Sequence, residues 1–190
     1  MPKYDPRKHH RRSIRLRGYD YSQPGAYFVT ICTYQKECLL GDVRAGEMAL
    51  SPYGRIVQRA WDDLPNHYPH VELDAWVIMP NHVHGIIVLG SDAAGACGVQ
   101  VGLSPAPAAF PSSRRHGLSE IMRALKSFSA RRINRLRRSP GTSFWQRGFY
   151  DHIIRHDREM DAIRQYIADN PLKWEFDQDN PSNISASQGR

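Results

Sequence analysis

The chain has no uninterrupted apolar run near the roughly 20 residues that a membrane-spanning helix needs. Its N-terminal stretch is basic and no apolar segment follows it, so a secretory signal peptide is not expected. Only three cysteines are present and none form a Cys-x-x-Cys pair, which argues against a disulfide framework or a cysteine-rich zinc site. These absences favour a protein of the reducing cytoplasm.

Positive charge is in excess, with 26 Lys and Arg against 19 Asp and Glu and a net charge of +7. A length of 190 residues and an apolar content of 41% suit one domain with its own core. The basic excess favours a polyanionic partner such as nucleic acid, although many basic proteins are merely soluble.

Apolar periodicity and turn residues place the secondary structure. Strands are expected at 26–33, 72–79, 82–90 and 144–155, and helices at 51–65, 118–138 and 157–171. Ser51 and Asp157 are the expected helix N-caps, and Pro171 is expected beyond the last helix. The order β-α-β-β-α-β plus a helix predicts a ferredoxin-like α+β fold. In that fold helices cover one face of a four-stranded antiparallel sheet, and here a C-terminal helix is added.

Composition divides the chain into one domain and three outlying segments. Residues 19–174 form the expected domain, with a low-complexity insertion at 91–117 that is rich in Gly, Ala, Pro and Ser. Residues 1–18 are expected to form a flexible basic arm, and 175–190 a loose polar tail. The amphipathic helix at 118–138 is expected to bury a stripe that includes Phe128 and Leu136.

Two histidines, His82 and His84, are separated by one residue at the start of an expected strand. Alternate side chains of a strand share a face, so both imidazoles could reach one metal ion. The bare triplet is a weak signal, and two partly buried histidines bonded to their neighbours are the plain alternative. Because a catalytic metal site needs a third protein ligand and no His-Glu-x-x-His motif is present, that ligand must come from elsewhere in the chain.

The last expected helix offers Tyr166 and Asn170, which are four residues apart and therefore neighbours on its surface. If this helix lies against the histidines, a phenol and an amide oxygen join them. A phenol with a pKa near ~10 needs help to attack a phosphodiester, from a divalent ion or from basic side chains that favour the phenolate. The alternatives are an amphipathic tyrosine at a core edge and an asparagine that ends a helix.

A second tyrosine, Tyr150, is the rival nucleophile because Asp151 and His152 directly follow it. These two neighbours are otherwise candidates to support the metal site through hydrogen bonds to its ligands.

Several stretches together carry a family resemblance: GAYFVTICT, MPNHVHG, LKSFSARRIN, FWQRGFYDHIIR and YIADNP. Over roughly residues 11–174 the chain resembles the single-tyrosine HUH transposases of the IS200-like group, and more closely their REP-associated relatives. The resemblance implies that His82, His84 and Asn170 bind Mg²⁺ or Mn²⁺. It implies that Tyr166 attacks single-stranded DNA beside a hairpin, leaving a 5′-phosphotyrosine and a 3′-hydroxyl that can be rejoined. Asparagine at the third ligand position is typical of the REP-associated type. That type can act as a monomer and IS200-like relatives are dimers, so both a monomer and a homodimer are left open for this chain.

The basic residues are the expected DNA contacts, at the nucleoid of a bacterial cytoplasm. They lie in the N-terminal arm and on the helix at 118–138, namely Arg11, Arg12, Arg15, Arg17, Arg123, Lys126, Arg131 and Arg135. An RNA-binding module of the RRM type has the same element order, and a DNA-binding regulator without catalysis would have the same charge. Both remain alternatives at this stage.

Overall fold

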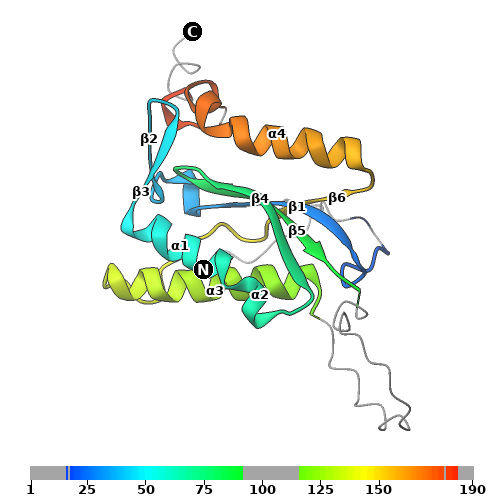
Figure 1. Cartoon of the computed structure of the whole chain (residues 1–190). Helices are drawn as coiled ribbons and strands as arrows, with labels where there is room; N and C mark the ends of the chain where they lie inside the picture. Colours follow the sequence, from blue (N-terminus) through cyan, green and yellow to red (C-terminus); the bar gives the residue numbers. More distant parts are fainter. Residues whose placement is uncertain (1–15, 17, 92–115, 178, 184–190) are drawn as a thin grey trace, which may run out of the picture.

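An antiparallel sheet forms the centre of the computed structural model, which describes residues 16, 18–91, 116–177 and 179–183 (Figure 1). Its strands are β1 (Gly25–Cys32), β4 (Val71–Ile78), β5 (His82–Leu89) and β6 (Tyr150–Ile154). They lie in the order β4-β5-β1-β6, and every neighbouring pair is antiparallel. This is the strand order of the split β-α-β arrangement, so the expected ferredoxin-like fold is confirmed.

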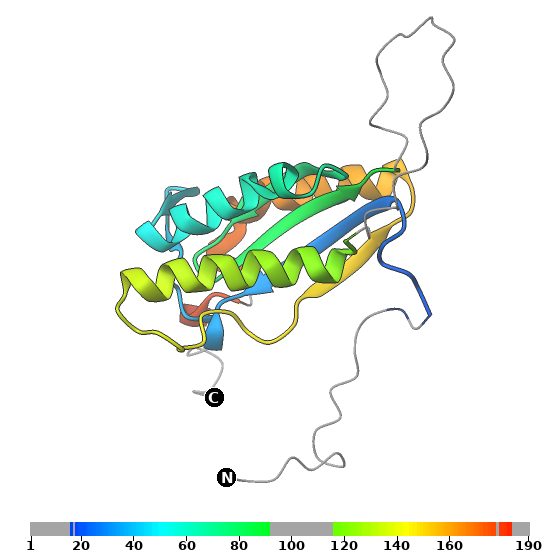
Figure 2. The ribbon, with the colours of Figure 1, turned by 90° about the horizontal axis from the view of Figure 1, so that it is seen from below.

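Helices cover both faces of the sheet. Helices α1 (Pro52–Asp62), α2 (Leu64–His67) and α3 (Leu118–Leu136) lie on one face, and α4 (Asp157–Lys173) lies on the other (Figure 1). Seen from below, α1 and α3 run side by side under the strands (Figure 2). The larger core lies between the sheet and α1 and α3, and a smaller one, centred on Ile86, Ile154 and Ile167, lies under α4.

Helix α1 begins as its sequence predicts. The Ser51 hydroxyl accepts hydrogen bonds from the amides of Tyr53 and Gly54, both at 3.1 Å. Near its end, Trp61 packs so close to β5 that a Cβ at Gly85 would lie 2.3 Å from the indole. Gly85 therefore allows α1 to approach the strand that carries the two histidines.

Helix α4 differs from the prediction at both ends. Its N-cap is His156 and not Asp157, because the His156 imidazole accepts a hydrogen bond from the Glu159 amide at 3.2 Å. The helix also continues through Pro171 to Lys173. A proline in the last turn removes one backbone hydrogen bond there, which the packed helix tolerates.

The buried face of α3 was also predicted wrongly in its second half. Phe128 and Leu136 are exposed, and the buried positions are taken by Ser129, Ile133 and Asn134. The two polar side chains bond the segment that precedes β6: Ser129 accepts from the Trp145 indole at 3.0 Å, and Asn134 donates to a backbone carbonyl of that segment. The strand-type pairing of that segment is limited to an isolated bridge between Trp145 and Thr33, the residue after β1, so β6 begins six residues later than expected.

Two further features were not predicted. A hairpin of β2 (Gly41–Arg44) and β3 (Glu47–Leu50) turns at Ala45 and Gly46, where both residues have positive φ. Instead of a loose tail after Trp174, the chain forms a 3-10 turn (Trp174–Phe176), and Asp179 bonds the side chains of Lys36 and Asn81.

The predicted arm at 1–18 and insertion at 91–117 lie largely outside the described residues. Within the described ranges, no helix has the length and apolar character needed to cross a membrane.

Candidate active site

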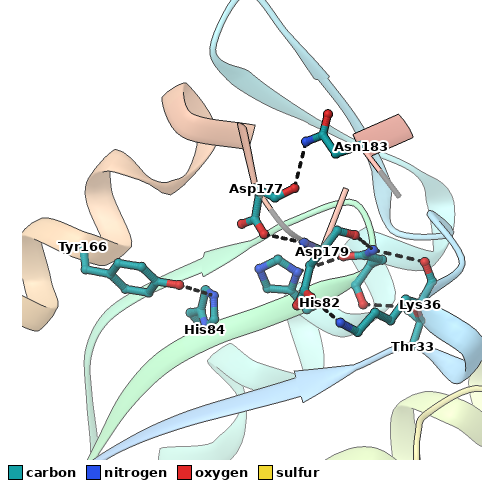
Figure 3. A network of polar contacts seen from close by, with 9 residues as sticks. Thr33, Lys36, His82, His84, Tyr166, Asp177, Asp179 and Asn183 are labelled. Carbon is teal, nitrogen blue, oxygen red and sulfur yellow. Dashed lines mark hydrogen bonds and ion pairs between the residues drawn. The ribbon is translucent and has the colours of Figure 1, made fainter. Parts of the chain in front are cut away.

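The two histidines share one face of the sheet, as their spacing predicted, and α4 covers that face. In the sheet register His82 is opposite Cys32 and His84 is opposite Thr30. Their side chains are 1% and 6% exposed, and their ring centres are 4.5 Å apart. From α4, the Tyr166 hydroxyl reaches to 3.2 Å from His84 Nε2 (Figure 3). The fold thus joins two neighbouring imidazoles to a phenol from a distant part of the chain.

Asn81 fixes the orientation of His82. Its amide nitrogen donates to the backbone carbonyls of Lys36 and Asp179, so its Oδ1 faces His82 Nδ1 at 2.8 Å as an acceptor. His82 Nδ1 must then carry the proton, and Nε2 presents its lone pair. That nitrogen is buried and has no hydrogen-bond partner in the structure.

Thr30 and Phe28 hold the ring of His84. The Thr30 hydroxyl lies 2.8 Å from His84 Nδ1, and the Phe28 ring stacks on the imidazole with centres 5.4 Å apart. When Nδ1 donates to Thr30, Nε2 accepts from the Tyr166 hydroxyl. The same lone pair would be needed by a metal ion, so the phenol and an ion compete for His84 Nε2.

Asn170 lies one helical turn beyond Tyr166 and completes the group. Its side chain is 3% exposed, and its Oδ1 is a second buried atom without a hydrogen-bond partner. Leaving such atoms unsatisfied costs free energy, and a cation bound among them would remove that cost. Two imidazole nitrogens and an amide oxygen are chemically suited to a divalent metal. Within the described ranges, no three or more His, Cys, Asp or Glu side chains are gathered to hold an ion, and at this site the third donor is the amide of Asn170.

Burial dominates the protonation of these groups. It lowers the pKa of His82, against the opposing effect of Asp177 and Asp179, and it lowers the pKa of His84 to about 3 with a further contribution from His82. Both imidazoles are therefore neutral at physiological pH, which is the form that ligates metals.

Burial also raises the pKa of Tyr166, and Asn170 opposes this effect. The charged groups that act on the phenol are Asp177 and Asp179, which raise its pKa further. None of the groups that shift the pKa of Tyr166 among the described residues is basic, so the possible help of basic side chains finds no support there.

An ion pair positions α4 on the sheet. Arg164, two residues before Tyr166, binds Asp74 of β4 through two hydrogen bonds of 2.9 and 2.8 Å. Asp74 lies where β4 shifts register, and it also accepts from the Ala75 amide. This bidentate contact helps to set where Tyr166 meets His84.

The rival residues lie apart from the histidine pair. Tyr150 is two strands away from His84 on the same face, opposite Thr30, and is 41% exposed. His152 bonds Glu159 at 2.7 Å. Asp151 is opposite Val29 and therefore belongs to the other face of the sheet. The geometry brings Tyr166, and not Tyr150, to the histidines.

The residues predicted to contact DNA fall into three groups: exposed arginines on α3, a lysine bonded to the backbone, and arginines outside the described residues. Arg123, Arg131 and Arg135 are exposed on α3. Lys126 donates to the backbone carbonyls of Gln146 and Gly148, so it ties α3 to the loop before β6. Arg11, Arg12, Arg15 and Arg17 lie outside the described residues.

Sequence reasoning missed both Thr30 and Asn81. The signal for Asn81 was its place directly before the histidines. Thr30 has no local signal, because its role depends on the pairing of β1 with β5.

The fold and the site define an α+β protein in which paired histidines on a central strand meet a tyrosine from a separate helix. Residues 109–170 match the family described as "Transposase IS200 like", a span that contains Tyr166 and Asn170 but not the histidines. An uncharacterised protein of Haemophilus influenzae is 38% identical over 177 residues, which cover 93% of this chain and 96% of that protein. The chain belongs to the IS200-like transposase family.

A solved structure of a REP-associated tyrosine transposase bound to a REP hairpin has a similar fold. The TM-score is 0.56 at 21% identity, and the match covers 85% of this chain and 74% of that chain. Family and fold together indicate an enzyme that processes DNA.

Proposed function

We propose that this protein is a metal-dependent endonuclease and strand transferase that cuts single-stranded DNA beside a hairpin through a covalent bond to Tyr166. The contact of 3.2 Å between the Tyr166 hydroxyl and His84 Nε2 carries the proposal. The contact supports the choice of Tyr166 as the nucleophile, because the phenol lies beside a pair of neutral imidazoles.

His82, His84 and Asn170 would hold a Mg²⁺ or Mn²⁺ ion, which two buried atoms without partners support. Bound there, the ion supplies a positive charge that stabilises the negative charge developing on the phosphate. Asn81 and Thr30 keep the ligand nitrogens of the two histidines turned toward it.

In the proposed reaction the Tyr166 oxygen forms a bond to phosphorus while the bond from phosphorus to the 3′-oxygen breaks. The phenolic proton ends on the released 3′-oxygen, and the 5′ end stays esterified to Tyr166. His84, whose pKa is about 3, is too weak a base to remove this proton, and its hydrogen bond to the phenol would be given up when an ion binds Nε2. Attack by a 3′-hydroxyl on the phosphotyrosine reverses the exchange and joins strands without an added energy source.

The proposed substrate is DNA that carries a palindromic hairpin, by analogy with the hairpin bound to the similar solved protein. One copy of the chain supplies both histidines, Asn170 and Tyr166, which supports a monomer as the active unit. The protein would act at the nucleoid. The RRM alternative is disfavoured because α4 covers the sheet face on which such modules stack bases.

The test uses labelled single-stranded DNA hairpins with Mg²⁺, Mn²⁺ or chelator, followed by denaturing electrophoresis. We expect a covalent adduct with an ion and none with chelator. Tyr166→Phe should abolish the adduct and keep hairpin binding, whereas the matched control Tyr150→Phe should keep both. Loss of the adduct in Tyr150→Phe and its survival in Tyr166→Phe would overturn the assignment. A wild-type protein that binds hairpins and never forms an adduct would instead be a regulator without catalysis.

A further inference from the structure

A cleft between α1 and α3 brings three arginines together on the face of the sheet opposite Tyr166. It has a volume of about 200 Å³ and is lined by Ile56 and Arg59 of α1 and by Arg132, Arg135 and Leu136 of α3. We call it the arginine cleft. Arg59 and Arg132 were not among the DNA contacts expected from the sequence.

We propose that the arginine cleft binds backbone phosphates of the DNA hairpin stem, away from the point of cleavage. The identity of the ligand, a DNA hairpin, rests on the proposed function. The place where it binds is inferred from the cleft itself.

The charge in the cleft is not balanced from within. Among the described residues, none of the three arginines forms an ion pair. The carboxylate that Arg132 influences, Asp63, is itself bonded by Asn66 and His67. Like charges gathered at one place repel each other, and a bound phosphate would relieve that repulsion through charge-assisted hydrogen bonds.

The shape of the cleft suits a phosphate on a polymer better than an enclosed small molecule. Pockets for small molecules are mostly apolar and occupy about 300–1,000 Å³. The arginine cleft is smaller, and guanidinium groups from two helices line it. Guanidinium forks are geometrically matched to phosphate oxygens.

A duplex stem fits this surface better than unpaired bases do. Single-strand sites offer free aromatic rings on which bases stack. The exposed aromatic ring nearest in sequence, Phe128, is covered by the Arg132 guanidinium, 5.3 Å from the ring centre. This contact also holds Arg132 in place without neutralising it.

The test compares two double variants that remove equal charge. Arg59→Gln with Arg135→Gln alters the arginine cleft, and Arg55→Gln with Arg158→Gln alters exposed arginines that do not line it. Hairpin binding is measured by fluorescence anisotropy at several salt concentrations. The slope of log K against log salt is negative, and each lost phosphate contact should reduce its magnitude by about 0.9, so the cleft pair should reduce it by about 1.8. The control pair should leave the slope at the wild-type value.

Cleavage kinetics supply a second readout. Because the cleft and Tyr166 lie on opposite faces of the sheet, the cleft variants should raise KM and leave kcat unchanged. Equal weakening by both double variants, or an unchanged salt slope in the cleft pair, would overturn the inference. If the wild-type protein forms the Tyr166 adduct but the cleft double variant binds hairpins as tightly as wild type, the role of the cleft is rejected and the proposed reaction stands. If the cleft double variant binds hairpins more weakly but the wild-type protein never forms an adduct, the proposed reaction is rejected and the role of the cleft stands.

Discussion

At the scale of single residues, Thr30 orients His84. Its hydroxyl bonds Nδ1 of the imidazole, whereas Tyr166 contacts the other ring nitrogen, Nε2. Thr30→Val keeps the shape of the side chain and removes the hydroxyl, so the imidazole loses its fixed orientation. Groups that orient metal ligands typically contribute about 10- to 100-fold in affinity, and we expect Mn²⁺ binding to weaken by that order. Calorimetric titration would measure it. Thr30→Ser should restore binding, and a Thr30→Val protein that binds as tightly as wild type would contradict this role.

The Tyr166 hydroxyl occupies the His84 nitrogen that an ion needs. Removing it in Tyr166→Phe should therefore tighten Mn²⁺ binding, by about 2- to 10-fold for one hydrogen bond of ordinary net strength. Electron paramagnetic resonance titration of free Mn²⁺ would show the change. Identical affinities in the two proteins would mean that hydroxyl and ion do not share the site.

Residue types and spacing made His82, His84, Tyr166 and Asn170 candidates for the site, and the family resemblance favoured them over the plain alternatives. Their convergence follows from two local periodicities, alternate positions on a strand and successive turns on a helix. Thr30 could not be found in the same way, because its contact depends on strand register and not on sequence distance. The Arg59 side of the arginine cleft likewise depends on how α1 packs beside α3.

At the scale of elements, the contact between α1 and β5 depends on the missing side chain at Gly85. Gly85→Ala would place a Cβ 2.3 Å from Trp61, so either the helix or the strand must shift. We expect a loss of about 1–3 kcal/mol in the free energy of unfolding, measured with urea. Gly90→Ala is the control, since its Cβ would meet only one atom, at 3.6 Å. Equal stabilities of the two variants would contradict the close approach.

The ion pair between Arg164 and Asp74 should make the attachment of α4 depend on pH. The Arg164 guanidinium lowers the pKa of Asp74, so the pair stabilises the fold above the ordinary pKa of an aspartate and loses this effect as the pH falls through the lowered value. Asp74→Asn should reduce the midpoint of thermal unfolding at neutral pH.

This difference from wild type should disappear once the pH has fallen below the lowered pKa of Asp74, where the carboxyl is protonated in both the folded and the unfolded state. Asp161→Asn, which breaks a contact made by Arg164 within α4, is the control and should have the smaller effect. A difference that persists in acid would contradict the electrostatic origin.

The positions of the main strands and helices were predictable, whereas several boundaries and the small hairpin were not. The hairpin of β2 and β3 is short, and its turn at Ala45 and Gly46 is a weak signal. Apolar periodicity placed Phe128 and Leu136 in the core, but Ser129 and Asn134 are buried because they bond the segment before β6. Tertiary hydrogen bonds of this kind outweigh periodicity and leave no pattern along the sequence.

At the scale of the whole molecule, the two cores are unequal. The larger joins the sheet to α1 and α3, and the smaller holds α4 with few fully buried side chains. The free energy needed to open an element locally is smaller where fewer apolar side chains are buried. We therefore expect α4 to detach before the rest of the fold unfolds. Native-state hydrogen exchange should show weaker protection for the amides of α4 than for those of α3 and β5. Equal protection throughout would show that α4 unfolds only with the whole domain.

Tyr166 and Asn170 belong to α4, whereas both histidines belong to the sheet. Displacement of that one helix would withdraw the attacking oxygen and a proposed ligand in the same movement. Under the proposed chemistry, a cation retained by the imidazoles alone would have no nucleophile beside it. Strand scission would then require α4 to be docked on the sheet, and a protein with α4 displaced would meet DNA without nicking it.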